Sequence, residues 1–432
     1  MYLLYSALLA LGLILSLPYW LLQSLRTGKY RRGLGERLGR VPQRLSQEST
    51  RPAIWVHAVS VGEVLAISDL VQELRRRHPE YRIVVSTTTD TGQKLAQTRL
   101  GRENVFYFPL DFAFAIRPYL RTLKPKLIVI AETEFWINFL RLAQESDARL
   151  AVVNARISDR SWRGYRRWRG ILKRVLEPVD IFLAQSGEDQ RRLVEIGAPA
   201  DRVRVSGNLK FDAAAPDTSP VLLDVRQAFE RTTTGPVLVC GSTVEGEEAL
   251  LADAFRAVRQ LHPQAVMLVA PRHPERFAEA ARVFEESGLP LVRRSAWRGE
   301  PLAGAVFLVD SIGELASLYA LADIAFVGGS LVPRGGHNIL EPALWGAAIV
   351  VGPHTENFRD VVLFFQNRNA VRIAAAAELS SVFIALLADE AERKRLGFRA
   401  AETVRMQKGA TQTTVQALEG LLDQSAGQDP QP

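Results

Sequence analysis

The chain alternates short apolar segments with helical patterns, and after an interruption near its middle it does so again. This alternation is typical of parallel α/β sheets, because neighbouring parallel strands are joined by crossovers that are usually helical. In such sheets ligands bind beyond the carboxyl ends of the strands, so polar residues that directly follow an apolar segment are candidates for a site. Strands are predicted at 53–58, 82–86, 105–108, 127–131, 150–154, 181–185 and 203–206, then at 237–240, 265–270, 306–309, 324–327, 348–351 and 371–373.

The length of 432 residues favours two domains of this kind. The segment Ala213–Pro220, rich in alanine, proline, aspartate and serine, is the predicted linker between them. We therefore expect doubly wound domains at 28–212 and 213–423. The end of the chain, 424–432, has the composition of a disordered tail.

The N-terminal segment Met1–Ser24 carries no charged side chain, and a basic stretch beginning at Arg26 follows it. As a helix it is long enough to cross a hydrocarbon core of about 30 Å. A secretory signal peptide has its positive charges before the apolar core, not after it. We predict a membrane anchor at 1–27 with the rest of the chain on the cytoplasmic side. The alternative is an interfacial segment that does not span, because Pro18 and its aromatic neighbours interrupt the run.

The net charge of +7 favours an anionic partner, such as a membrane surface, a phosphorylated substrate or a nucleic acid. The single cysteine, Cys240, excludes a disulfide framework and favours a reducing compartment. Neither a Cys-His cluster nor an HExxH motif is present in the sequence, so no metal site is predicted.

Three polar motifs follow predicted strands in the first half: SVGE at 60–63, ETEFW at 132–136 and NARIS at 154–158. Glutamates near a helix N-terminus are also common as favourable charges without any catalytic role. Placed at a strand end, however, two carboxylates can point toward one site. The candidates from these motifs are Ser60, Gly62, Glu63, Glu132, Glu134, Asn154 and Arg156.

The second half has a glycine-rich loop at 328–336 between a predicted strand and a short helix that we expect to open at His337 and Asn338. Backbone N–H groups at such a helix N-terminus bind anions, and Glu341 one turn later is suited to accept from a ribose diol. A glycine-rich turn with a capped helix is the alternative. Further candidates for phosphate or sugar contacts are Lys210, Ser242, Thr243, Arg272, Gly335 and Gly336.

The segment Arg160–Arg174 is densely basic, with Trp162, Tyr165 and Trp168 three residues apart, as on one side of a helix. It is either a solvated basic helix or a surface for a membrane or a phosphorylated lipid. Single-stranded nucleic acid fits the composition less well, because no nucleic-acid-binding motif accompanies it.

Taken in order behind the apolar N-terminus, SVGE, AETEFW, NARIS, GNLKFD, PRHPER and GGSLVPRGGHNILEP resemble the Kdo (3-deoxy-D-manno-octulosonic acid) transferase family. The resemblance covers nearly the whole chain and implies a GT-B fold, in which two Rossmann-like domains face a cleft. It implies inverting, metal-independent transfer from CMP-Kdo to lipid IVA, the lipid A precursor, at the bacterial inner membrane, without a cofactor and without nucleic acid. The first domain would hold the acceptor and the second the CMP-sugar.

The resemblance also assigns roles to residues. The general base falls on Glu63, and Glu132 matches a position important for activity. Ile137 departs from the family motif, in which proline often follows AETEFW. The implied CMP contacts are Arg272, His273, Ile312, Gly313, Glu314, Asn338, Ile339, Leu340 and Glu341.

Two other classes of protein remain open at this point. Another GT-B enzyme, such as a nucleotide-sugar glycosyltransferase or a non-hydrolysing epimerase, would bind UDP rather than CMP. A non-enzymatic protein that binds anionic lipid would tolerate the loss of Glu63, whereas a transferase would not.

Overall fold

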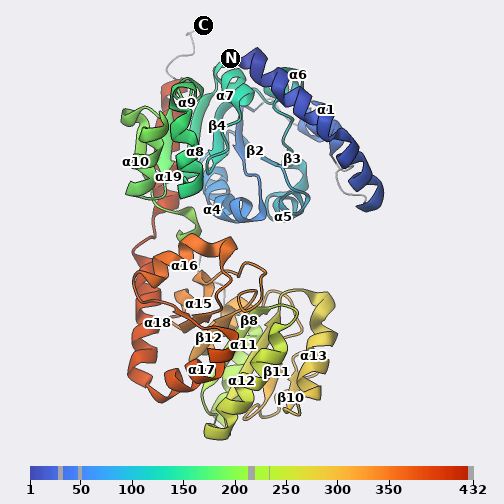
Figure 1. The fold of residues 1–432 in the computed structure, drawn as a ribbon, viewed down its shortest axis with the longest axis vertical. Helices are drawn as coiled ribbons and strands as arrows, with labels where there is room; N and C mark the ends of the chain where they lie inside the picture. The colour runs from blue at the N-terminus through green and yellow to red at the C-terminus, as the bar shows by residue number, and fades with distance from the viewer. Residues whose placement is uncertain (28–32, 47–50, 213–218, 233, 427–432) are drawn as a thin grey trace. The chain divides into compact units, whose positions relative to one another are not determined.

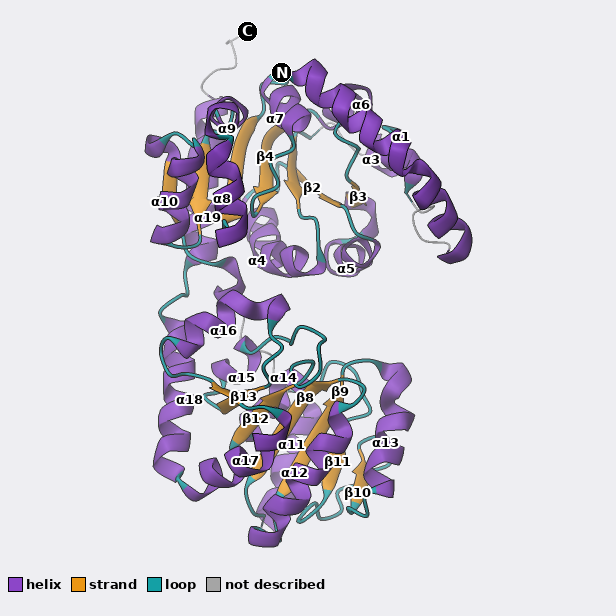
Figure 2. Cartoon of the chain, viewed as in Figure 1, coloured by secondary structure: helices purple, strands orange, loops and turns teal. Residues whose placement is uncertain are grey.

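The computed structural model describes the chain apart from 28–32, 47–50, 213–218, 233 and 427–432. It contains two compact units, one of Met1–Ala213 with Gln407–Pro432 and one of Ala214–Met406. Each unit is built on a seven-stranded parallel sheet flanked by helices (Figure 1, Figure 2). The predicted linker falls largely on 213–218, outside the described residues.

The first sheet has the strand order β3-β2-β1-β4-β5-β6-β7. The order reverses between β1 and β4, which pair in parallel, and this reversal is where doubly wound sheets bind their ligands. The strands are β1 (Ala53–His57), β2 (Arg82–Thr87), β3 (Val105–Tyr107), β4 (Pro125–Ala131), β5 (Arg149–Ala155), β6 (Ile181–Ala184) and β7 (Val203–Val205).

Helices cover both faces of this sheet because successive strand residues point to opposite sides. Trp55 of β1 belongs to the core under α6, α7, α9 and α10, whereas Ile54 and Val56 belong to the core under α4, α5 and α19. The helices are α1 (Tyr2–Thr27), α2 (Leu34–Arg37), α3 (Gln43–Ser46), α4 (Val61–Arg77), α5 (Asp90–Leu100), α6 (Ala113–Leu123), α7 (Ile137–Gln144), α8 (Asp159–Arg167), α9 (Arg169–Leu176), α10 (Gly187–Ile196) and α19 (Ala410–Ala426).

The second sheet repeats the pattern, with the order β10-β11-β9-β8-β12-β13-β14 and a reversal between β8 and β12. Its strands are β8 (Val237–Thr243), β9 (Val266–Pro271), β10 (Leu291–Arg293), β11 (Val306–Leu308), β12 (Ile324–Val327), β13 (Ala348–Val351) and β14 (Arg372–Ile373). Its helices are α11 (Pro220–Arg231), α12 (Glu247–Leu261), α13 (Phe277–Glu286), α14 (Leu315–Leu318), α15 (Leu340–Leu344), α16 (Arg359–Gln366), α17 (Leu379–Ala388) and α18 (Glu390–Arg405).

The predicted α/β class and every predicted strand are confirmed, although β8 runs on to Thr243. Within the described residues, β10 is the strand that the sequence did not predict. It is a three-residue edge strand whose side chains are all only partly buried, so it carries little apolar signal.

The C-terminal boundary of the second domain is corrected by the structure. The prediction ended it at 423, but α19 belongs to the first unit, where Val415, Leu418 and Leu421 pack in one core with Ile181 and Leu183 of β6. The Asp212 carboxylate accepts from the N–H groups of Gly409 and Thr411 at the start of α19. The predicted disordered tail begins inside this helix, which ends at Ala426, and the rest of it lies outside the described residues.

The N-terminal segment forms α1, which packs against α7 of the first unit. The Asn138 amide donates to the Ser6 hydroxyl over 3.0 Å, and the Arg141 guanidinium lies 4.9 Å from the centre of the Tyr2 ring. Among the helices in the part of the chain that the structure describes, none has the length and apolarity that crossing a membrane requires.

The basic, aromatic segment 160–174 is divided between two helices rather than lying on one. The helical conformation is interrupted at Trp168, between α8 and α9, so the three aromatic side chains do not share one environment. The Trp162 indole donates to Glu195 over 2.8 Å, and the Tyr165 ring lies 6.4 Å from the Phe135 ring, whereas the Trp168 side chain is exposed.

Candidate active site

Glu63 lies in the first turn of α4, directly after β1 and beside the point where the first strand order reverses. Ser60 precedes the helix as its N-cap and accepts from the Glu63 N–H. The Glu63 carboxylate in turn accepts from the Val59 N–H and the Ser60 hydroxyl, each over 2.8 Å. This reciprocal arrangement is a variant of the capping box, in which the carboxylate accepts from the N–H of the residue before the N-cap, and it holds the carboxylate at the carboxyl edge of the sheet.

The Glu63 side chain is largely buried, with 7% of the residue exposed. Burial raises its pKa from 4.5 to about 7, and the charges of Glu132 and Glu134 add to this rise. The two hydrogen bonds from Val59 and Ser60 act in the opposite direction, because they stabilise the ionised form. A carboxylate that titrates near neutral pH is suited to act as a general base.

Glu132 and Glu134 follow β4, the strand that pairs with β1. Glu132 has a left-handed backbone (φ 58°), which a non-glycine residue adopts at some energetic cost. Its carboxylate lies 3.6 Å from the Lys210 ammonium. Burial, with a contribution from Glu132, raises the pKa of Glu134. The structure therefore brings three carboxylates and one lysine from separate motifs to one edge of the first sheet.

The remaining candidate residues of the first unit take part in local hydrogen bonds or helix capping. Ser60 is committed to the capping box, and Gly62 lies in the first helical turn beside it. Asn154 is fully buried with a φ of 53°, and its side-chain oxygen accepts from the Leu209 N–H over 3.0 Å. The Arg156 carbonyl accepts from the Thr133 hydroxyl and so connects the NARIS and ETEFW motifs.

In the second unit, the loops after β9 and β12 approach each other. Arg272 and His273 are exposed after β9, and both charges lower the pKa of His337 in the glycine-rich loop. Burial is the larger cause, and together they bring the pKa of His337 to about 4. His337 is therefore neutral at physiological pH, whereas Arg272 is a fixed cation at this edge.

At several residues predicted to contact the CMP-sugar, the hydroxyl, backbone N–H or side chain is already engaged within the protein. The Thr243 hydroxyl is buried and donates to Glu248, and the Gly336 N–H donates to the Gly329 carbonyl. The side chains of Ile339 and Leu340 are buried in the unit, so they present only backbone. Ser242, with a φ of 56°, is partly exposed beside Thr243.

The short helix of this loop begins later than predicted. α15 starts at Leu340, and Asn338 lies before it rather than at its first residue. The Asn338 side chain still has a capping role, because its oxygen accepts from the Leu340 N–H over 3.1 Å, while its amide donates to Glu341 over 3.3 Å. Gly335 has a left-handed backbone (φ 87°), and a Cβ there would lie 2.4 Å from the Asn357 side chain.

The implied CMP contacts Ile312, Gly313 and Glu314 lie between β11 and α14. Ile312 is exposed, Gly313 has a φ of 87°, and Glu314 accepts from the Ser311 hydroxyl and pairs with Arg294 at 3.4 Å. Throughout the described residues, no group of three or more His, Cys, Asp or Glu side chains is arranged to hold a metal ion.

Comparison with known proteins identifies the family. The model of the 3-deoxy-D-manno-octulosonic-acid transferase (kdotransferase) N-terminal region matches residues 32–213. A 3-deoxy-D-manno-octulosonic acid transferase of Haemophilus influenzae is 31% identical over 98% of this chain and 99% of its own length. One from Bordetella pertussis is 37% identical over 89% of this chain and 91% of its own. The chain belongs to the Kdo transferase family.

The fold of this Kdo transferase family member is GT-B. Its architecture is similar to the crystal structure of a UDP-GlcNAc 2-epimerase from Neisseria meningitidis, with a TM-score of 0.55 over 85% of this chain and all of the other. The identity is only 12%, so this likeness concerns the fold alone. Because an epimerase shares the fold, it is the sequence relatives, and not the architecture, that separate the Kdo transferase family from the epimerase alternative.

Sequence reasoning did not select the buried Glu247 and Glu248 or the partly buried His337 as site residues, although all three lie near the Kdo transferase motifs. Adjacent glutamates at the start of a helix look like ordinary favourable charges. The signal that could have found Glu247 and Glu248 was their position, shortly after the Gly241–Thr243 segment that ends a buried strand.

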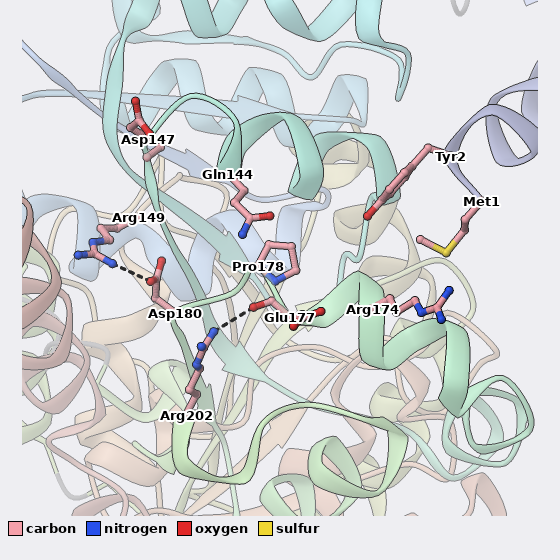
Figure 3. A pocket seen from close by; sticks show the side chains of 11 residues that line it. Met1, Tyr2, Gln144, Asp147, Arg149, Arg174, Glu177, Pro178, Asp180 and Arg202 are labelled. Atoms are coloured by element: carbon pink, nitrogen blue, oxygen red, sulfur yellow. Dashed lines mark hydrogen bonds and ion pairs between the residues drawn. The ribbon is translucent and has the colours of Figure 1, made fainter.

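A cavity of about 780 Å³ in the first unit is lined by residues outside the Kdo transferase motifs. Figure 3 shows the side chains that line it. It opens where β5 and β6 begin, which is the amino edge of the sheet. Arg149 pairs with Asp180 over 3.1 Å, and Arg202 donates to the Glu177 carbonyl over 2.9 Å. None of the residues predicted to bind or catalyse lines this cavity.

Proposed function

We propose that the chain transfers Kdo from CMP-Kdo to the lipid A precursor lipid IVA, with inversion at the anomeric carbon and without a metal ion. Membership of the Kdo transferase family supports the sugar and the reaction class. The resemblance of the ordered sequence motifs to those of the family supports CMP-Kdo as the sugar donor and lipid IVA as the acceptor. In this proposal the first unit binds the acceptor and supplies the base, and the second unit binds the donor.

The observation that carries the proposal is the environment of Glu63. A buried carboxylate with a pKa of about 7, beside Glu132 and Glu134, is both present as a base and able to take a proton near neutral pH. We propose that Glu63 removes the proton of the acceptor hydroxyl. The acceptor oxygen then bonds to the anomeric carbon of Kdo as the bond from that carbon to the CMP phosphate breaks, and CMP departs with the electron pair.

The donor side needs groups that stabilise the departing phosphate. Arg272 is exposed, permanently charged and close enough to His337 to lower its pKa, so it is suited to this role. His273 lies next to it, and Glu341 lies at the start of α15 in a position to accept from ribose hydroxyls. Lys210, which pairs with Glu132, is better suited to orient that carboxylate than to contact the phosphate.

The acceptor is a lipid, and α1 has one face suited to a lipid surface. Leu3, Leu4, Leu8, Leu11 and Leu15 are exposed, while Ser6 and Tyr2 face α7. We propose that this apolar stripe lies in the membrane interface and that the basic residues of α8 assist with phosphate groups. An inner-membrane location on the cytoplasmic side follows from this proposal.

The test is mass spectrometry of lipid IVA incubated with the purified chain, CMP-Kdo and EDTA. A mass increase of one or more Kdo residues is expected, and the same result would establish metal independence and count the sugars added. No increase with a folded chain and detergent-dispersed acceptor would contradict the proposal. Stabilisation against heat by UDP but not CMP would then favour another nucleotide-sugar enzyme of the same fold.

A further inference from the structure

Two adjacent carboxylates, Glu247 and Glu248, are buried in the first turn of α12, with 0% and 1% of each residue exposed. Glutamate is almost never fully buried unless it is paired or hydrogen-bonded, because removing a charge from water is costly. Each of these two must therefore have a set of partners that compensates its burial. The partners lie on different loops of the predicted donor site.

Glu247 binds the backbone of the glycine-rich loop directly after β12. One carboxylate oxygen accepts from the N–H groups of Ser330 and Leu331, each over 2.9 Å. The other accepts from Gly329 over 2.8 Å and from Val244 over 3.1 Å. All three consecutive N–H groups of 329–331 are thus satisfied from within the protein, so they are not available to a donor phosphate.

The backbone of the loop is shaped around this carboxylate. A Cβ at Gly328 would lie 2.7 Å from a Glu247 oxygen and 2.5 Å from the Ser242 carbonyl, so only glycine fits there. Ser330, once held by Glu247, accepts at its carbonyl from the His354 N–H over 2.9 Å and at its hydroxyl from the Gly352 N–H over 2.8 Å. One buried charge therefore sets the backbone at the ends of both β12 and β13.

Glu248 binds the loop after β9 in a similar way. Its carboxylate accepts from the Thr243 hydroxyl over 3.0 Å and pairs with Arg276 at 3.3 Å. The Thr243 carbonyl accepts from the Arg272 N–H over 2.9 Å. Arg276 also donates its N–H to the His273 carbonyl over 3.0 Å. Arg272 and His273 are thereby held between Thr243 and Arg276, both of which contact Glu248.

We infer that Glu247 and Glu248 are positioning residues that together set the geometry of the donor site before the donor binds. Glu247 acts through the glycine-rich loop that carries His337 and Asn338, and Glu248 acts through the loop that carries Arg272 and His273. Neither carboxylate touches the donor. The inference rests on the proposed function to the extent that the second unit binds a cytidine nucleotide.

The experiment compares Glu247→Gln and Glu248→Gln with Asp253→Asn in the full-length chain. Glutamine has nearly the same shape, but its NH₂ group cannot accept, so backbone N–H groups of the loop or the Arg276 guanidinium lose a partner. Asp253 is an exposed carboxylate of the same helix and pairs with Arg256 of that helix, which makes it a matched control. Calorimetry measures CMP binding, steady-state kinetics gives a separate KM for donor and acceptor, and a thermal melt gives stability.

Each of the two buried substitutions should weaken CMP binding and raise the donor KM by about tenfold or more, with the acceptor KM unchanged and the control normal. A lower melting temperature with CMP affinity and donor KM like those of the unsubstituted chain would mean a purely structural role and would overturn the inference. If the unsubstituted chain itself does not bind CMP, the proposed function fails instead.

A second measurement needs no substitution and decides the matter if a variant does not fold. Hydrogen exchange of the Gly329, Ser330 and Leu331 amides is followed in the unsubstituted chain with and without CMP. Slow exchange in both states is expected, because Glu247 binds these amides in the absence of a ligand. Rapid exchange that becomes slow only with CMP would show that the nucleotide orders the loop, and would overturn the inference.

Discussion

At the scale of single residues, Glu63 combines two requirements that oppose each other. As part of a capping box it receives two hydrogen bonds that favour its ionised form, and as a buried group beside two other carboxylates it is pushed toward the neutral form. The second effect is the larger, since the pKa rises to about 7. The residue that we propose as the base is therefore also part of a helix cap, and its pKa is raised by where that cap lies rather than by an unusual local motif.

Glu63→Gln should retain most of the cap, because the glutamine oxygen still accepts from the Val59 N–H and its NH₂ group can donate to the Ser60 hydroxyl, but it removes the proposed base. We expect kcat to fall by about 10² to 10⁴, the usual contribution of general base catalysis, with CMP binding unchanged. The assay is the mass-spectrometric transfer reaction together with calorimetry of CMP binding. Turnover close to that of the unsubstituted chain would contradict the assignment and would favour the lipid-binding alternative.

The same variant has an expected effect on stability. Because the pKa of Glu63 is higher in the folded chain than its ordinary value of 4.5, ionisation favours unfolding, and this penalty develops as pH rises from about 4.5 to 7. At pH 8, Glu63→Gln should therefore have a free energy of unfolding up to about 3 kcal/mol larger than that of the unsubstituted chain, and so a higher melting temperature. At pH 4.5 the two free energies should differ little. An equal difference at both pH values would contradict the raised pKa.

Glu134→Gln tests the electrostatic origin of that raised pKa. The Glu134 charge raises the pKa of Glu63, so its removal should lower that pKa and move the acidic limb of the profile of kcat/KM against pH to lower pH. Asp253→Asn, an exposed carboxylate on α12, is the control and should leave the limb in place. A shift to higher pH would mean that Glu134 does not act on Glu63 through its charge.

At the scale of elements, α1 has two faces with different partners. One face contacts α7 through Ser6 and Tyr2, and α7 directly follows the loop that carries Glu132 and Glu134. The other face exposes a row of leucines, and an exposed apolar patch of this kind marks an interaction surface. The element that we propose to contact the membrane is thus packed on the helix that follows Glu132 and Glu134.

Leu8→Asp should weaken binding of the full chain to vesicles of anionic phospholipid by about tenfold or more. It removes a leucine that would be buried in the membrane interface and places a charge there. Sedimentation with the vesicles measures the bound fraction. Leu261→Asp is the control, since Leu261 is similarly exposed but lies on α12 of the second unit. Equal binding of both variants and the unsubstituted chain would show that α1 is not the membrane contact.

At the scale of the whole molecule, the two units are not simply successive in the sequence. The chain completes the first sheet, then builds the second unit, and finally returns with α19 to the first unit. Four large apolar side chains of α19 are buried there: Val415, Leu418, Leu421 and Leu422. At about 1.5–3 kcal/mol each, their burial is comparable with the whole stability of a typical domain.

A chain truncated after Met406 should therefore have a first unit that is unfolded or melts far below its normal temperature, while the second unit retains CMP binding. Differential scanning calorimetry follows the transitions of the two units, and CMP identifies the transition of the second unit by raising its temperature. Loss of CMP binding together with a normal first transition would contradict the assignment of α19.

The motifs at strand ends show how much of the site the sequence could predict. Glu63, Glu132 and Arg272 were found because each directly follows an apolar strand, and in a parallel sheet the carboxyl ends of all strands meet at one edge. Thr243 and Gly336 were also selected by position, but their polar groups bind other parts of the protein. Position along a strand does not reveal which hydrogen bonds are already satisfied.

The sequence by itself determined the α/β class, the strands and the family motifs, because all three depend on residues that are close together in the chain. Tertiary structure alone decided the raised pKa of Glu63, the pairing of Lys210 with Glu132, the place of α19 and the burial of Glu247 and Glu248. Each of these depends on residues that are far apart in sequence or on the amount of water removed around a charge. The partner of a charged group and its degree of burial are set only when the chain folds, because the local sequence pattern specifies neither of them.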